Sequence, residues 1–214
     1  MFSGIVERKG IIQSLDLKDK WGKIAIDPRK PWDHPVEIGE SIAISGICLT
    51  VTDVVDGVLH FDVLRETFDR TTLGFRKVGQ FINMERSLRW GQEMGGHIVV
   101  GHVDGVATVE NIREVGRDWS FEFTCSDDLM DGVVYKGSVG IDGVSLTVAE
   151  LKEKTFSVHI IPFTYEQTTF GELKKGTPVN LEIDLLGKYA RRLLERGRVP
   201  GEVTWDSLRE TGLI

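Results

Sequence analysis

The stretch SGICLTV at residues 45–51 returns as DGVSLTV at residues 142–148, so one pattern occurs twice, 97 positions apart. Three further pairs share this offset: TFDRTTLG (67–74) with TYEQTTFG (164–171), VGQFINME (78–85) with KGTPVNLE (175–182), and Gly4 with Gly101. Several segments with one common offset are the signature of an internal duplication. The sequence therefore predicts a single module that is present twice.

In each copy the apolar residues recur with the short period that is typical of β-strands. In the first copy Ile42 and Ile44 alternate with smaller residues, and residues 58–63 and 156–161 are rich in β-branched and aromatic side chains. Short helices are also predicted, with Thr67 and Thr164 as N-caps and with ends at Gly74 and Gly171. Several short strands and one small helix per copy favour a compact closed barrel.

The C-terminal segment has a helical period instead. From Asp184, which is placed to cap a helix, apolar residues recur at helical spacing: Leu185, Leu186, Tyr189, Leu193 and Leu194. This helix is expected to end at Gly197, and a second short helix to run from Thr204 to Gly212. We expect barrels over residues 1–97 and 98–186, and a helical tail over 187–214 that forms an oligomer contact. Docking of the helix on its own barrels is the alternative.

The composition excludes several classes of protein. With 26 basic and 33 acidic residues the formal charge is −7, which argues against a sequence-independent nucleic-acid binder. No apolar run has membrane-spanning length, and residues 1–7 lack the pattern of a signal peptide. Cys48 and Cys125 are too few for a disulfide framework, and His97 and His102 are poorly spaced for zinc. We expect a cytoplasmic protein with reduced thiols and no bound metal or cofactor.

Candidate reactive residues differ between the two copies. Strand alternation places Cys48 and Thr50 on one face and Leu49 on the other, and Ser145 stands where the second copy repeats Cys48. The other differences pair Ser45 with Asp142, Gly39 with Lys136, and Ile5 with His102. Such an uneven distribution of a thiol, an imidazole, an ammonium and a carboxylate is typical of two related sites with unequal tasks.

Each of these residues also has a structural interpretation. A lone cysteine is most often a small buried apolar residue. His102 lies in a glycine-flanked stretch that equally fits a surface turn. Lys136 beside Gly137 is most often a solvated turn lysine, and Asp142 before Gly143 is most often a turn former.

Four motifs together resemble the bacterial riboflavin synthase α-chain family. They are residues 1–7 (MFSGIVE), residues 46–52 (GICLTVT), residues 95–103 from Gly95-Gly96-His97 to Gly101-His102-Val103, and residues 140–148 (GIDGVSLTV). The resemblance extends from Met1 to about Leu194 and includes residues 180–184 (NLEID). Each motif alone is modest evidence, whereas the ordered set is specific. After about Arg198 no motif supports it.

The resemblance implies an all-β fold of two tandem six-stranded Greek-key barrels and a C-terminal α-helix through which a homotrimer assembles. It implies dismutation of two molecules of 6,7-dimethyl-8-ribityllumazine into riboflavin and 5-amino-6-(D-ribitylamino)uracil, without metal or redox cofactor. Each barrel would bind one lumazine, and the reacting pair would meet between unlike barrels of neighbouring subunits. Holding two rings face to face lowers the entropic cost of reaction. Whether lumazine synthase is a partner stays open.

The resemblance also implies site residues. The first site is expected to contain Gly4, Ile5, Val6, Ser41, Cys48, Leu49, Thr50, Asp62, Val63, Leu64, Arg65, Glu66, Thr67, Gly101, His102 and Val103. The second is expected to contain Lys136, Ser145, Leu146, Thr147, Ile161, Pro162, Phe163, Thr164, Tyr165 and Glu166. The C7 methyl of the substrate is acidic, so the reaction needs a base and a nucleophile. We assign proton transfer to His102 and attack at C7, directly or through water, to Cys48 and Ser41.

Two other classes of protein share parts of this pattern. Lumazine-binding fluorescent proteins have the duplicated fold but only bind the chromophore, and they tend to lack the Cys-Leu-Thr motif and the histidine. Because Cys48, Leu49, Thr50 and His102 are all present, the enzyme is favoured. The FAD-binding barrel of a reductase would need a nucleotide-binding partner domain, for which the sequence offers no G-x-G-x-x-G motif.

Overall fold

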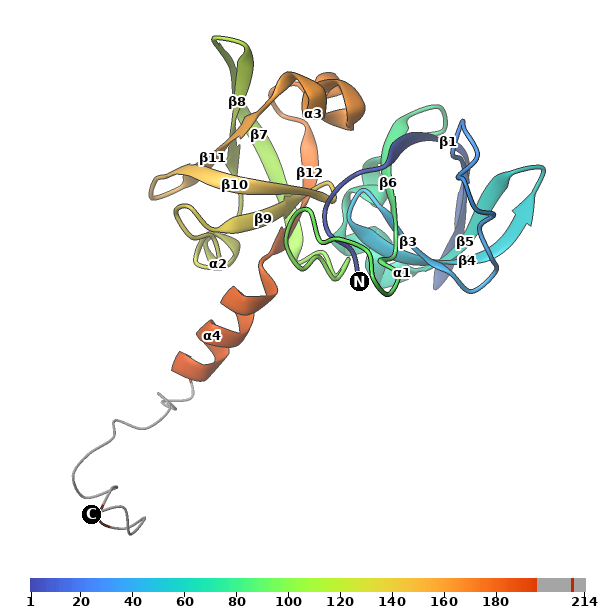
Figure 1. Ribbon diagram of the computed structural model, residues 1–214, viewed down its shortest axis with the longest axis horizontal. Helices are drawn as coiled ribbons and strands as arrows, with labels where there is room; N and C mark the ends of the chain where they lie inside the picture. The colour runs from blue at the N-terminus through green and yellow to red at the C-terminus, as the bar shows by residue number, and fades with distance from the viewer. Residues whose placement is uncertain (196–208, 210–214) are drawn as a thin grey trace.

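The computed structural model describes residues 1–195 and residue 209 and contains two closed antiparallel barrels of six strands each (Figure 1). The first barrel consists of β1 (Arg8–Leu17), β2 (Trp21–Asp27), β3 (Ser41–Ile44), β4 (Ile47–Val55), β5 (Val58–Leu64) and β6 (Phe81–Arg86). The second consists of β7 (Gly105–Val115), β8 (Asp118–Thr124), β9 (Ser138–Ile141), β10 (Val144–Leu151), β11 (Thr155–Ile160) and β12 (Pro178–Ile183).

The duplication is confirmed at the level of single strands. Each strand of the first barrel begins 97 residues before its counterpart in the second. The strand order around the barrel is β1-β2-β5-β4-β3-β6 in the first copy, and the second copy has the equivalent cyclic order. The predicted all-β fold with tandem barrels is therefore confirmed.

The short helices differ in detail from the prediction. In each copy an α-helix follows the fifth strand and a 3-10 helix follows at once: α1 (Arg65–Arg70) and η1 (Thr72–Phe75), and α3 (Pro162–Gln167) and η2 (Thr169–Glu172). Thr67 and Thr164 are not N-caps, because both lie inside the helices, whose N-cap positions are Leu64 and Ile161. The capping hydroxyls belong instead to Thr71 and Thr168, which accept hydrogen bonds from backbone N–H groups of η1 and η2.

Each barrel encloses its own hydrophobic core. The first is mainly aliphatic, whereas the second contains Phe121, Phe123, Phe156 and Phe170. Strand alternation holds as predicted, because Leu49 and Val51 are buried while Thr50 is exposed and Cys48 is half-buried on the outer face. Closed barrels leave no sheet edge, so chemistry is confined to their outer faces and to the segments that cross them.

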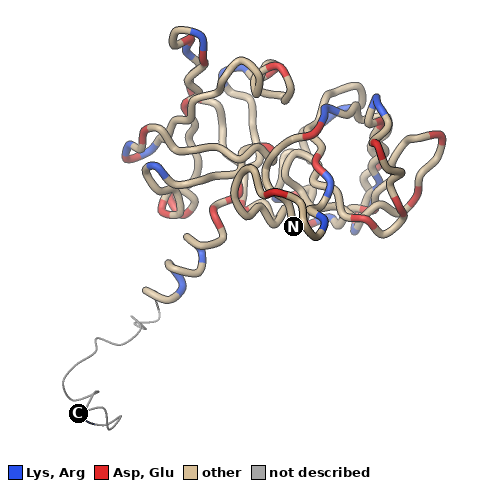
Figure 2. Tube along the Cα trace, in the orientation of Figure 1, with Lys and Arg blue, Asp and Glu red and all other residues tan. Residues whose placement is uncertain are grey.

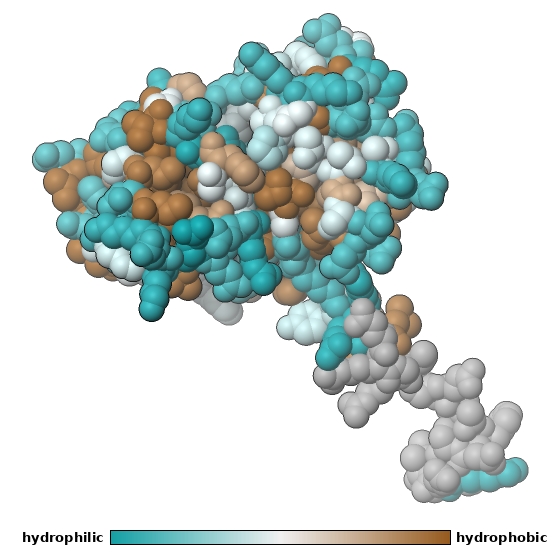
Figure 3. All heavy atoms as spheres, turned by 180° about the vertical axis from the view of Figure 1, so that it is seen from behind, coloured by the Kyte–Doolittle hydropathy of each residue, from teal (hydrophilic) through white to brown (hydrophobic). Residues whose placement is uncertain are grey.

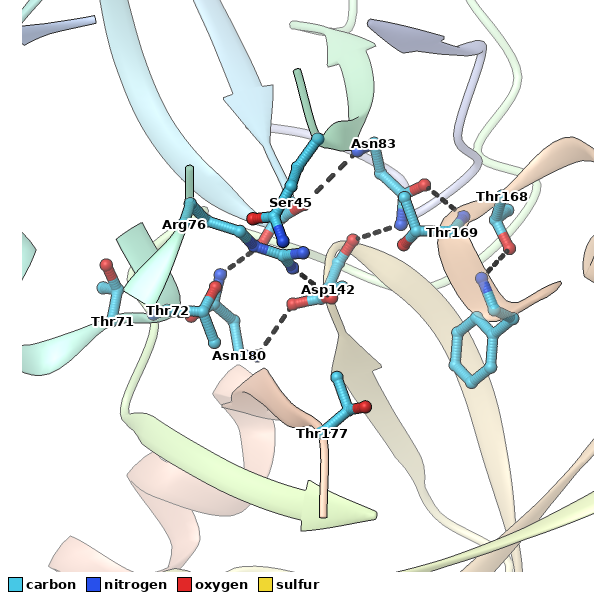
Figure 4. A network of polar contacts seen from close by, with 12 residues as sticks. Ser45, Thr71, Thr72, Arg76, Asn83, Asp142, Thr168, Thr169, Thr177 and Asn180 are labelled. Atoms are coloured by element: carbon cyan, nitrogen blue, oxygen red, sulfur yellow. Dashed lines mark hydrogen bonds and ion pairs between the residues drawn. The ribbon is translucent and has the colours of Figure 1, made fainter. Parts of the chain in front are cut away.

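A symmetric network of buried polar groups joins the barrels (Figure 4). Asn83 donates to the carbonyl of Asp142 (2.9 Å), and its repeat equivalent Asn180 donates to the carbonyl of Ser45 (2.8 Å). Each asparagine oxygen also accepts a backbone N–H of the opposite copy, that of Thr169 at 2.9 Å and that of Thr72 at 2.7 Å. These four bonds all cross between the copies, so they fix the two barrels relative to one another.

One ion pair breaks this symmetry. Arg76 donates to the fully buried carboxylate of Asp142 at 3.0 Å, whereas the repeat equivalents, Leu173 and Ser45, carry no charge. Asp142 does occupy a turn, as predicted, with φ +44°. Burial raises the pKa of Asp142, and Arg76 acts against that rise.

The C-terminal helix α4 (Leu185–Glu195) projects from the second barrel and away from both cores (Figure 1). Asp184 caps it as predicted, accepting from the Leu186 N–H at 3.0 Å. Leu186, Tyr189 and Leu194 are each about two-thirds exposed, and apolar atoms are visible on the projecting helix in Figure 3. Docking of this stripe on the chain's own barrels is therefore excluded.

The helix does contact the second barrel at its base, where Lys188 pairs with Asp104 (2.7 Å) and Arg191 with Asp128 (2.6 Å) beside the short helix α2 (Asp127–Met130). The predicted end at Gly197 and the predicted second helix from Thr204 to Gly212 lie outside the described residues. No helix among the described residues is long and apolar enough to cross a membrane.

Candidate functional site

The outer face of the first barrel brings the predicted polar residues into register. Ser41 pairs with Thr50 across β3 and β4, and Ala43 pairs with Cys48, so that Ser41, Cys48 and Thr50 share this face. On the next strand Val51 pairs with Phe61, and Asp62 follows it, so Asp62 extends the same polar face. The arrangement is a row of hydroxyl, thiol and carboxylate groups along adjacent strands.

A pocket of about 420 Å³ opens where the row meets α1. Its lining includes Cys48, Thr67 and His102, and the remaining residues are Ile47, Glu66, Arg70, Thr71, Gly101 and Val103. The pocket therefore joins predicted residues from the strand, from the helix and from the segment between the two barrels. Its volume is that of ordinary small-molecule sites.

Gly101 brings His102 to this pocket by crossing over β4. The Cys48 N–H donates to the Gly101 carbonyl at 2.9 Å. A Cβ on Gly101 would lie 2.6 Å from the Cβ of Cys48, and its φ is +83°, so only glycine fits. The buried Glu182 holds this crossing by accepting from the N–H groups of Val100 (2.8 Å) and Gly101 (3.1 Å).

The N-terminal arm makes the equivalent crossing on the second barrel. The Ser145 N–H donates to the Gly4 carbonyl at 2.7 Å, and the buried Glu85 accepts from the N–H groups of Ser3 (2.7 Å) and Gly4 (3.0 Å). Val6 packs on the second core, whereas Val103 packs on the first. Gly4, Ile5 and Val6 therefore belong with the second barrel, and their predicted grouping with the first site is wrong.

His97 is a member of the second site that sequence reasoning missed. Its Nδ1 lies 2.7 Å from the Ser145 hydroxyl, and its buried Nε2 has no hydrogen-bond partner among the described residues. Burial lowers the pKa of His97, and the nearby Asp184 carboxylate partly opposes this shift. A neutral imidazole beside a hydroxyl can accept its proton. Comparison of the copies could not reveal this pair, because His97 lies between the two copies and outside their repeated segments.

The segment between the two barrels, which contains Gly95 and Gly96, also covers the second site more than the first. A Cβ on Gly96 would lie 2.7 Å from the Cβ of Ser145, and Gly95 approaches Ile5. Neither Gly95 nor Gly96 lines the Cys48 pocket. The two sites are thus unequal in both chemistry and covering.

The other predicted residues occupy three kinds of position. Side chains that face a core, so that only their backbone can meet a ligand, are Leu49 and Val63, with Leu146 packed against the second core. Exposed positions are Leu64, Arg65, Lys136, Thr147, Ile161, Phe163 and Glu166. Pro162, Thr164 and Tyr165 are half-buried in α3, where the Tyr165 ring stacks on Trp119 at 3.9 Å. Lys136 has φ +62° in an exposed turn.

Comparison with known proteins agrees with this geometry. The lumazine binding domain model matches twice, at residues 3–87 and 100–184. Riboflavin synthase of Escherichia coli is 40% identical over 185 residues, which cover 86% of this chain and 87% of that protein. Riboflavin synthase of Bacillus subtilis is 38% identical, covering 92% and 91%.

Solved structures of the lumazine protein LumP are similar in fold. LumP in complex with riboflavin is 28% identical, has a TM-score of 0.77 and covers 86% of this chain and 99% of its own. LumP in complex with 6,7-dimethyl-8-ribityllumazine has a TM-score of 0.74. With two domain matches and relatives of 38–40% identity over most of its length, the chain belongs to the riboflavin synthase family of tandem lumazine-binding domains.

Proposed function

We propose that the chain catalyses the riboflavin synthase reaction, in which two molecules of 6,7-dimethyl-8-ribityllumazine give one riboflavin and one 5-amino-6-(D-ribitylamino)uracil. Four carbons pass from one lumazine to the other, so the atoms balance without an external oxidant or reductant. The observation that carries the proposal is the pair of equivalent outer-face sites, one centred on Cys48 and the other on Ser145. A reaction between two identical substrates in different roles requires such related but unequal sites.

In the first site, we assign proton transfer to His102 and attack at C7 to Cys48, assisted by Ser41. His102 is exposed at the mouth of the pocket that Cys48 lines. Ser41 lies on the same outer face of the barrel, two residue pairs along β3 and β4 from Cys48. An imidazole can both take up and release a proton in the neutral pH range. The neighbouring Thr50 hydroxyl is placed to bind the polar edge of the substrate.

In the second site, we assign activation of Ser145 to His97. The 2.7 Å contact and the lowered pKa of His97 favour a neutral ring that takes the hydroxyl proton as a general base. The Gly96 backbone lies against Ser145 and covers part of this half-buried side chain. Thr147 stands where the first site has Thr50, and the same role is assigned to it.

The assembly we propose is a cytoplasmic homotrimer formed through α4. The exposed Leu186, Tyr189 and Leu194 form an apolar stripe that a helix normally buries. Closed cyclic assembly through this helix would bring the first barrel of one subunit beside the second barrel of the next. That arrangement would let the two lumazines meet, because the two sites lie on the outer faces of different barrels. Association with lumazine synthase would be a further, separate interaction.

Incubation of the purified chain with the lumazine distinguishes the enzyme from a binding-only relative. We expect lumazine absorbance to fall while riboflavin fluorescence rises. Saturable binding of lumazine with no riboflavin formed would place the chain with proteins that only hold the chromophore.

A further inference from the structure

A basic pocket lies on the first barrel and adjoins the second lumazine site at one end, where Gln167 is the repeat equivalent of Arg70, a lining residue of the first site. It has a volume of about 370 Å³ and is lined by Glu7, Arg8, Lys9, Pro28, Arg29, Lys30, Pro31 and Gln167. Four cations face one pocket in a chain whose formal charge is −7. Arg8 and Lys9 begin β1, and Arg29 and Lys30 lie in the loop after β2. Figure 2 shows Lys and Arg in blue on the first barrel. Gln167, at the end of α3, adds an amide from the second barrel.

The protein compensates the positive charge of this pocket only in part, through Glu7 and through Asp33 near Arg8. Its one lining carboxylate, Glu7, is already engaged by the Trp32 indole N–H and by the Arg86 backbone N–H (3.2 Å). Lys9 is only 3.9 Å from Glu172, and Arg29 and Lys30 form no ion pair with any described residue. A ligand with negative charge would supply the missing partner.

The pocket is also held in shape before any ligand arrives. The Arg8 guanidinium stacks on Trp32 at 3.7 Å from the ring centroid and donates to the Lys30 carbonyl at 2.5 Å. Its Nε atom is buried without a partner. Arg29 adopts φ +62°, a strained conformation for a non-glycine residue, fixed by its N–H bond to Asp27 at 2.7 Å. Strain of this kind concentrates at binding sites.

The duplication separates the four cations of this pocket from the lumazine sites. At the repeat offset, the four cations Arg8, Lys9, Arg29 and Lys30 correspond to Gly105, Val106, Ser126 and Asp127. The second copy thus has no equivalent basic pocket, whereas it does repeat the lumazine site. A function that belongs to the duplicated module would be expected in both copies.

We propose that this pocket binds a small phosphate monoester, with the phosphate held by Arg8, Arg29 and Lys30. Guanidinium groups present a planar pair of donors that suits phosphate, and a doubly charged phosphate matches several cations better than a single carboxylate does. The volume leaves room for an attached organic group beside Gln167. A bound ester would contact both barrels across their seam.

Calorimetric titration of the full chain with inorganic phosphate and with glycerol 3-phosphate, at constant ionic strength, tests this. We expect one saturable site, weakened about tenfold or more by Arg29→Ala with Lys30→Ala. Both residues are exposed, and alanine at position 29 has to adopt the same φ that Arg29 adopts. The control Lys18→Ala with Lys20→Ala removes two exposed cations from the same barrel and should bind normally.

Three results would overturn the proposal. The first is that the chain shows no saturable binding of either phosphate, and the second is that the control variant loses as much binding as Arg29→Ala with Lys30→Ala. The third is that the chain co-sediments with phosphatidylglycerol vesicles and that Arg29→Ala with Lys30→Ala abolishes this. The last would assign the pocket to a lipid headgroup. Riboflavin formation measured without phosphate should be the same in all variants, because none of the four substituted residues lines a lumazine site.

Discussion

At the scale of single residues, Cys48 is the sharpest test of the proposed chemistry. Cys48→Ser keeps the shape and installs the residue that the second copy already has in Ser145. We expect ligand binding to persist while kcat falls roughly tenfold or more, because a hydroxyl ionises far less than a thiol. Cys125→Ser is the matched control: burial raises the pKa of Cys125 to about 11, so it stays a thiol, and its loss should leave kcat unchanged. Equal kcat in all three proteins would show that Cys48 only packs.

His97 should give the fold a measurable pH dependence. Its folded pKa is lowered by burial, so the unfolded chain binds the proton more readily. The stabilisation due to the neutral ring is present above the ordinary pKa near 6.5 and is lost as pH falls through the folded pKa. His97→Gln should remove this part of the slope when unfolding free energies are measured by denaturant between about pH 5 and 7.5. Parallel curves for wild type and variant would contradict a buried neutral imidazole.

At the scale of elements, the seam between the barrels depends on the Arg76–Asp142 pair. Arg76→Leu, which copies Leu173, leaves a buried carboxyl without its partner and should cost about 3–5 kcal/mol. Adding Asp142→Ser, which copies Ser45, should recover part of that loss. The four free energies of unfolding form a double-mutant cycle. Additive effects would mean that the two side chains do not interact.

Helix α4 should govern the oligomeric state. Leu186→Lys with Leu193→Lys puts charges on the apolar stripe, and sedimentation velocity should then show monomers that bind lumazine but turn over poorly. Val115→Lys, at an exposed position at the end of β7, is the control and should stay assembled. If the double variant sediments like the wild type, the assembly forms through another surface.

At the scale of the whole molecule, sequence periodicity and the internal offset were sufficient to predict two barrels and the outward face of Cys48 and Thr50. They were not sufficient to predict which barrel each connecting arm covers. The contacts of Gly4 with Ser145 and of Gly101 with Cys48 join residues far apart in sequence, and local pattern carries no signal for such contacts. The helix N-caps were misassigned for the same reason. Thr67 and Thr71 are both suitable N-cap residues, and only the position at which β5 ends determines which of them caps a helix.

The central claim is that each barrel holds one lumazine, and a matched pair of variants tests it most directly. Thr50 and Thr147 are equivalent, exposed positions on the outer faces of the two barrels, so tryptophan there should block a site without disturbing a core.

The measurement is the number of molecules bound per chain of a lumazine analogue that lacks the C7 methyl group and therefore cannot react. We expect two molecules for the wild type and one for each of Thr50→Trp and Thr147→Trp, with riboflavin formation lost in both variants. One molecule bound by the wild type, or two bound by either variant, would contradict it.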